Sequence, residues 1–141
     1  MKTGKYPNTF YRVSVKAIIR NKKGEVLVVK EHGGPWSLPG GGIDHGETAE
    51  VALAREMYEE LLVTESFTAM PKGIDQMFLE SRDAYLLWVV YELSFDSLPI
   101  AQVGEDGDEA AYIDPRQFKD SVNRSERLVY RWCVDRAAAF E

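Results

Sequence analysis

Apolar and polar residues alternate along residues 11–19, which is the pattern of a strand with one buried face. A polar turn at 21–24 follows, and residues 25–30 then form a second apolar segment. Because a short polar turn between two such segments is typical of a hairpin, we expect these two strands to pair. Residues 32–42 are rich in glycine and proline, which predicts a loop or a short irregular strand.

The later part of the chain combines strands with two helical segments. Residues 48–61 have helical periodicity, and residues 125–140 have it less regularly. A long polar loop is expected at 94–108. Further strands are expected at 73–80, 84–93 and 110–113. Strands interspersed with two separate helices predict an α+β fold, in which a mixed β-sheet lies between helices as an α/β/α sandwich.

The composition is that of an ordinary globular protein. The chain has 141 residues, of which 45% are hydrophobic and 28% charged, so we expect a single domain over residues 1–141. Its net charge of −6 disfavours binding to nucleic acid, because such binding relies on lysine and arginine. The one cysteine excludes an intramolecular disulfide. We find no signal peptide and no apolar run of membrane-helix length, and therefore expect a cytoplasmic protein without membrane contact.

Acidic residues gather on one face of the predicted helix. Glu56 and Glu60 are one helical turn apart with no lysine between them, and two charges about 5 Å apart repel by roughly 3 kcal/mol at an effective dielectric near 20. Together with Glu59 they suit Mg²⁺ or Mn²⁺, which prefer oxygen ligands. The alternative is a solvated acidic face. The opposite, apolar face is expected to comprise Val51, Ala54, Met57, Tyr58 and Leu61.

The spacing of these residues resembles a known motif. Gly41, Glu47 and the run Arg55-Glu56-Met57-Tyr58-Glu59-Glu60-Leu61-Leu62-Val63 are similar to the Nudix box, G-x5-E-x7-R-E-U-x-E-E-x-G-U, where U is bulky and apolar. Every fixed position matches except the last glycine, which is Leu62 here. The resemblance implies a Nudix fold and the hydrolysis of a nucleoside diphosphate linked to another moiety.

The resemblance also implies a metal site. Glu59 and Glu60 would be the main ligands of Mg²⁺, with Mn²⁺ as a substitute, and the carbonyl oxygen of Gly40 would complete the shell. Glu56 would be a further ligand or the base that deprotonates the attacking water. The metal would neutralise the phosphates and lower the pKa of that water.

Two further acidic positions follow from the resemblance. Arg55 would pair with Glu47 or Glu56 and hold the carboxylates in place, although Glu47 is also a favourable acid near a helix N-terminus. Several family members add a carboxylate from a late loop, and Glu105 is our first choice for it. A solvated acidic loop is the alternative for each candidate there. The other candidates in this loop are Asp106, Asp108 and Glu109.

Leu62 departs from the motif at the expected end of the helix. The resemblance implies that the family's glycine adopts a left-handed conformation there, which glycine tolerates. Leucine in that conformation would cost about 1–2 kcal/mol. Either Leu62 accepts this strain, or the helix ends differently.

The expected partner is a small nucleotide or nucleotide derivative. Gly41 would lie beside it, and Phe78 and Tyr85 are candidate nucleobase contacts, although aromatic residues more often belong to a core. The markers of several family subgroups are missing, and the short chain, with little beyond the core fold, favours a nucleoside triphosphate or another small nucleotide. A non-catalytic Nudix domain that senses a nucleotide is the alternative, but such domains usually lose glutamates of the box. A homodimer is compatible with the family.

Overall fold

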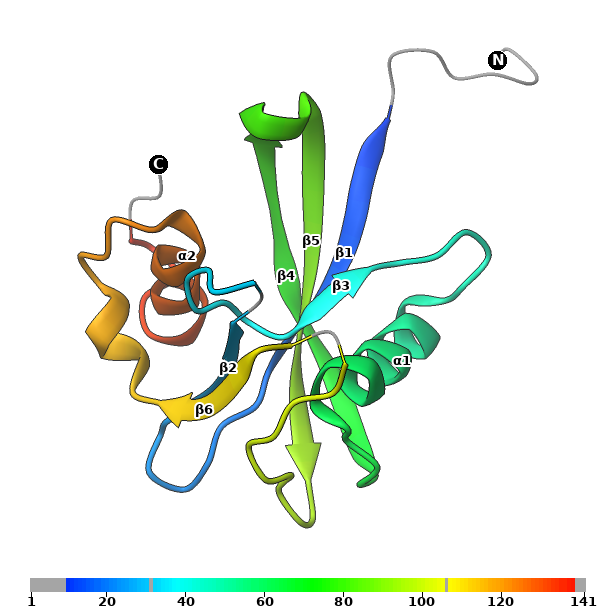
Figure 1. Ribbon diagram of the computed structural model, residues 1–141, viewed down its shortest axis with the longest axis vertical. Helices are drawn as coiled ribbons and strands as arrows, with labels where there is room; N and C mark the ends of the chain where they lie inside the picture. The colour runs from blue at the N-terminus through cyan, green and yellow to red at the C-terminus, as the bar shows by residue number, and fades with distance from the viewer. Residues whose placement is uncertain (1–9, 31, 106, 139–141) are drawn as a thin grey trace.

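A mixed sheet separates the two α-helices of the computed structural model, which describes residues 10–30, 32–105 and 107–138 (Figure 1). This arrangement confirms the predicted α/β/α sandwich. In chain order the elements are β1 (Tyr11–Ile18), β2 (Val26–Lys30), β3 (Gly40–Gly42), α1 (Ala49–Leu61), β4 (Phe67–Leu79), the 3₁₀-helix η1 (Glu80–Arg82), β5 (Ala84–Phe95), β6 (Glu109–Ile113), the 3₁₀-helix η2 (Pro115–Phe118) and α2 (Arg124–Cys133).

The strands form two sheets. The larger sheet has the order β3-β1-β5-β4, in which β1 runs parallel to β5 and the other neighbours are antiparallel, and the smaller sheet pairs β2 with β6. The predicted hairpin of residues 11–19 and 25–30 is therefore wrong beyond its turn. The turn itself forms, with a bridge between Arg20 and Val26. Because β1 already pairs with β3 on one side and β5 on the other, β2 pairs with β6 instead.

Two elements differ in length from their predictions. The strand β4 begins at Phe67 rather than at residue 73, and its register shifts between Pro71 and Gly73. An edge strand with a bulge tolerates these residues, which otherwise interrupt strands. The last helix ends at Cys133 rather than at residue 140, because the amides of the next two residues both donate to the carbonyl of Tyr130. Residues 139–141 lie outside the described part of the chain.

Each face of the larger sheet carries its own hydrophobic core. On one face Val15 and Tyr91 pack with α1, and on the other Trp88 and Val90 pack with α2. The alternation of residues along β1 and β5 supplies both cores. Among the described residues, no helix has the length and apolar character needed to cross a membrane.

Candidate active site

The helix α1 carries most of the predicted site, and its first turn is capped by the hydroxyl of Thr48, which accepts the amide of Val51 at 3.2 Å. Its buried face differs from the predicted one. Val51 and Tyr58 are exposed, whereas Glu60 is 2% exposed. The helix is thus rotated so that one acidic residue points inward. A buried carboxylate needs polar partners, and its burial is an observation that periodicity alone does not provide.

The end of α1 resolves the question of Leu62. This residue has φ 56° and ψ 31°, so it occupies the left-handed region that the family's glycine tolerates. Its amide donates to the carbonyl of Tyr58 at 2.9 Å, and the amide of Val63 donates to that of Met57 at 3.2 Å. The helix therefore ends as the motif predicts, and Leu62 accepts the strain.

A cleft of about 620 Å³ opens beside the buried end of α1. It brings together predicted site residues from three segments: Gly40 and Gly41 from β3, Glu56 and Glu60 from α1, and Glu105 from the loop before β6. The other residues that line it are Lys16, His32, Pro35, Ser37, Asp108 and Ser125. Those that are not among the predicted site residues are Lys16, His32, Pro35, Ser37 and Ser125.

The glycines of β3 allow the strand to approach both the sheet and the helix closely. A Cβ at Gly40, where φ is 142°, would overlap the carbonyl oxygen of Val15 on β1. A Cβ at Gly41 would lie 2.6 Å from the Glu56 carboxylate. Any side chain at Gly41 would occupy the space that Glu56 now fills, so this glycine keeps the carboxylate in the cleft.

Glu60 connects α1 to β3. Its Oε1 accepts the amide of Gly40 at 2.8 Å, and this bond is buried. The bond compensates part of the cost of removing the carboxylate from water. It also ties the Glu60 side chain of α1 to the first residue of β3.

Glu56 lies in the same cleft with opposing influences on its charge. Burial raises the pKa of its carboxyl above the ordinary value, while the hydrogen bond from Arg55 and the charges of Arg55 and Lys16 act in the opposite direction. A carboxylate whose affinity for a proton is increased by burial is suited to act as a general base.

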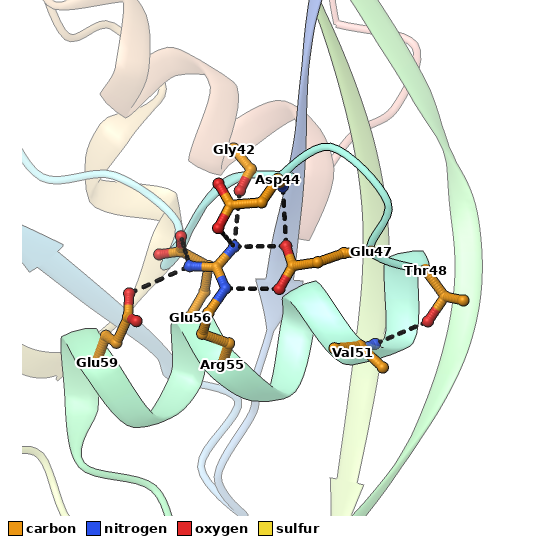
Figure 2. A network of polar contacts seen from close by, with 8 residues as sticks. All are labelled: Gly42, Asp44, Glu47, Thr48, Val51, Arg55, Glu56 and Glu59. Atoms are coloured by element: carbon orange, nitrogen blue, oxygen red, sulfur yellow. Dashed lines mark hydrogen bonds and ion pairs between the residues drawn. The ribbon is translucent and has the colours of Figure 1, made fainter.

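Arg55 organises the acidic residues around the cleft (Figure 2). Its Nε and Nη2 donate to the two carboxylate oxygens of Glu47 at 2.7 and 2.8 Å. Its Nη1 donates to Glu56 at 2.9 Å and to Glu59 at 3.1 Å. The predicted pairing of Arg55 with Glu47 or Glu56 is thus present for both partners. Because an arginine fork fixes both distance and direction, it holds these side chains in one arrangement.

The bidentate contact with Arg55 also determines the protonation state of Glu47. The hydrogen bond from Arg55 lowers the pKa of Glu47 from 4.5 to about 2, with the amide of Asp44 as the next cause. Arg55 further donates to the carbonyl of Gly42 at 3.0 Å. Glu47 is therefore ionised at neutral pH and ties α1 to the segment after β3.

Glu105 is positioned by a contact between its loop and the end of α1. The amide of Gly104 donates to the carbonyl of Glu60 at 2.8 Å, and a Cβ at Gly104 would overlap the carbonyl of Glu59. Both Glu105 and Asp108 line the cleft. Asp108 also accepts the amide of Gly33 at 2.6 Å. Asp106 lies outside the described residues, and Glu109 is exposed in β6.

The two aromatic candidates lie away from the carboxylates. Phe78 and Tyr85 face each other across β4 and β5 with ring centroids 5.0 Å apart, and Tyr85 also contacts Tyr11. Neither Phe78 nor Tyr85 is among the residues that line the cleft. Their role as nucleobase contacts stays a prediction that this placement does not support.

Comparison with protein families assigns the fold to a known group. The model of the NUDIX domain matches residues 10–133. The chain belongs to the NUDIX family. A MutT NUDIX hydrolase from Burkholderia pseudomallei superposes on this NUDIX domain with a TM-score of 0.71 and 23% identity, covering 89% of this chain and 98% of that one. A MutT protein from Methanosarcina mazei gives a TM-score of 0.70 and 22% identity, covering 94% of this chain and 100% of the other.

Sequence relatives of this NUDIX domain are larger proteins. An RNA pyrophosphohydrolase from Actinobacillus pleuropneumoniae is 36% identical over 109 residues, which cover 76% of this chain and 45% of the relative. The chain thus spans about half the length of this curated relative.

The donors of the cleft fit a divalent metal in chemical type. The carboxylates of Glu56, Glu60 and Glu105 and the main-chain oxygen of Gly40 are the hard ligands that Mg²⁺ and Mn²⁺ prefer. Within residues 10–30, 32–105 and 107–138, no three acidic, histidine or cysteine side chains are grouped closely enough to hold an ion. Glu56 and Glu60 instead accept hydrogen bonds from Arg55 and Gly40. Metal binding would require these carboxylates to exchange partners.

Proposed function

We propose that this NUDIX domain hydrolyses the diphosphate linkage of a nucleotide or nucleotide derivative with the help of Mg²⁺ or Mn²⁺. The observation that carries the proposal is the cleft that Glu56, Glu60 and Glu105 line together with the glycines of β3. Arg55 and Lys16 compensate part of the negative charge there, and the remainder favours a bound cation. A metal ion would provide this compensation and bind the anionic phosphates.

Each residue of the site has a proposed task. Glu59, Glu60 and the carbonyl of Gly40 would hold the metal, and Glu105 is a further candidate ligand. When bound, the metal would supply charge neutralisation and a lowered pKa of coordinated water. Glu56 would accept the proton of the attacking water. The water oxygen would form a bond to phosphorus while the bridging P–O bond breaks, and the leaving phosphate would keep the bridging oxygen.

Arg55 would act through the carboxylates rather than on the substrate. Its contacts with Glu47, Glu56 and Glu59 fix the positions of these side chains. Glu47 would serve as the fixed anchor of Arg55. We further propose that residues 1–141 act as one domain; cytoplasmic location and a homodimer stay predictions.

The substrate class is open to a direct test. We expect turnover of a small nucleotide, with nucleoside triphosphates tested first and ADP-ribose second. The panel should also contain 5′-triphosphorylated RNA oligonucleotides, because the relative from Actinobacillus pleuropneumoniae is an RNA pyrophosphohydrolase. Products should be separated by chromatography in the presence of Mg²⁺, of Mn²⁺ and of EDTA.

A pair of matched variants tests the assignment of the site. Glu60→Gln should lower turnover by at least about 100-fold, because charge neutralisation in such sites is worth several kcal/mol. Glu50→Gln removes an exposed charge from the first turn of the same helix and should leave turnover unchanged. Circular dichroism should show both variants folded. Turnover that survives Glu60→Gln would contradict the assignment, and nucleotide binding without turnover in the wild type would favour a sensing domain.

A further inference from the structure

One positive side chain enters the acidic cleft. Lys16 is the only lysine or arginine among the described residues that line it, whereas Glu56, Glu60, Glu105 and Asp108 contribute carboxylates. Lys16 lies on β1 in register with Gly40 of β3. It is therefore placed beside the strand whose amide binds Glu60.

The structure fixes the position of the Lys16 ammonium. Its Nζ donates to the carbonyl of Leu38 at 3.0 Å, and it lies 4.8 Å from the centroid of the Trp88 ring. Trp88 is 7% exposed, so surrounding residues hold its ring in place against the lysine. The Leu38 carbonyl and the Trp88 ring are uncharged, so these two contacts position the ammonium, while its charge also acts on the Glu56 carboxyl.

We propose that Lys16 is a substrate-binding residue of the cleft, whose ammonium contacts non-bridging oxygens of the phosphate chain. This inference rests on the phosphate-binding part of the proposed function. A diphosphate that enters the cleft meets repulsion from four carboxylates. Metal ions would offset one part of this repulsion, and a fixed cation on the β1 wall offsets another part. A phosphate group would thus be held between the metal ligands of α1 and Lys16 of β1.

The competing interpretation is that Lys16 only holds the carboxylates together. In that case its loss would disturb the metal site, and the affinity for Mn²⁺ would fall together with the affinity for phosphate. If Lys16 contacts the substrate, its loss weakens phosphate binding, while removing a positive charge leaves the affinity for Mn²⁺ unchanged or increased. The two affinities therefore separate the roles.

The experiment compares two lysines that lie over tryptophan rings. Lys16→Met removes the charge in the cleft. Lys30→Met is the matched control, because the Nζ of Lys30 lies 4.7 Å from the centroid of the Trp36 ring and Lys30 does not line the cleft. Calorimetry with inorganic pyrophosphate in EDTA measures phosphate binding, and electron paramagnetic resonance measures Mn²⁺ binding. Lys16→Arg retains the positive charge. It therefore separates the loss of charge from a general disturbance of the fold by substitution at position 16.

We expect Lys16→Met to weaken pyrophosphate binding by about tenfold, Lys16→Arg by less, and Lys30→Met by less than about twofold. The inference is overturned if Lys16→Met binds pyrophosphate as the wild type does, if the control loses as much affinity, if Mn²⁺ affinity falls in parallel, or if the wild type binds no pyrophosphate. Failure of the proposed function is distinguishable, since a wild type that binds pyrophosphate through Lys16 but hydrolyses no nucleotide refutes only the hydrolysis.

Discussion

The left-handed residue at the end of α1 makes a specific prediction about stability. Leu62 has a positive φ and is 38% exposed. Replacing Leu62 by alanine keeps the Cβ and therefore the backbone strain, whereas replacing it by glycine removes the strain. We predict that the Leu62→Gly variant is more stable than the Leu62→Ala variant.

The magnitude follows from two opposing contributions. A left-handed residue with a Cβ costs about 1–2 kcal/mol. Glycine relieves this strain, but it also lowers the free energy of unfolding by about 0.4–1 kcal/mol, because it increases the conformational freedom of the unfolded chain. The free energy of unfolding should therefore favour Leu62→Gly over Leu62→Ala by roughly 0.5–1 kcal/mol. Both variants lose the packing of the Leu62 side chain near Gly104, so this loss cancels in the comparison.

Urea denaturation of the two variants measures this difference, and the same helix offers a control. Ala54 is exposed in the interior of α1, and Ala54→Gly should cost about 1 kcal/mol, as glycine does in an ordinary helix. The exchange of alanine for glycine thus has opposite signs at positions 54 and 62.

One result would refute this reasoning. If Leu62→Gly is less stable than Leu62→Ala by an amount similar to the cost at position 54, then Leu62 has ordinary helical geometry. The helix α1 would then continue past Leu62 in solution instead of ending there.

Three further outcomes follow from the charges and burial of single side chains. The pKa of Glu47 is about 2 in the folded chain, compared with an ordinary value of 4.5. The ionised Glu47 therefore stabilises the fold above about pH 4.5, and this stabilisation is lost as the pH falls toward 2. Urea denaturation across this pH range should show that Glu47→Gln loses less stability on acidification than the wild type does. Arg55→Lys should reduce turnover by about tenfold or more in a steady-state assay, because lysine cannot form the fork to Glu47. Burial raises the pKa of Cys133 to about 12, so iodoacetamide at pH 8 should modify it only in urea, as mass spectrometry can show.

Local patterns in the sequence predict the elements but not their partners. The strand β1 and the helix α1 match the predicted segments 11–19 and 48–61 closely, because alternation and helical periodicity are local properties. The partner of β2 could not be predicted in this way. Its pairing with β6 joins residues more than 75 positions apart, and only the occupied edges of β1 explain it.

The site shows the same division. Glu56 and Glu60 of the Nudix box and the neighbouring Gly40 line one cleft, and a motif can indicate such residues because they lie within one short segment. Lys16 was missed because its position in an alternating strand is also that of an ordinary solvent-facing lysine. Periodicity places Glu60 on the side opposite the apolar face, although Glu60 is buried. The rotation of α1 that buries it depends on packing against the sheet, which periodicity does not contain.

Glu60 uses its side chain and its main chain in two different directions. The carboxylate receives the Gly40 amide and the carbonyl receives the Gly104 amide, so one residue joins the start of β3 to the loop that carries Glu105. The amide protons of Gly40 and Gly104 should consequently exchange with solvent at related rates. An insertion before Gly104 that moves this loop would therefore also displace Glu60 and, through its carboxylate, the start of β3.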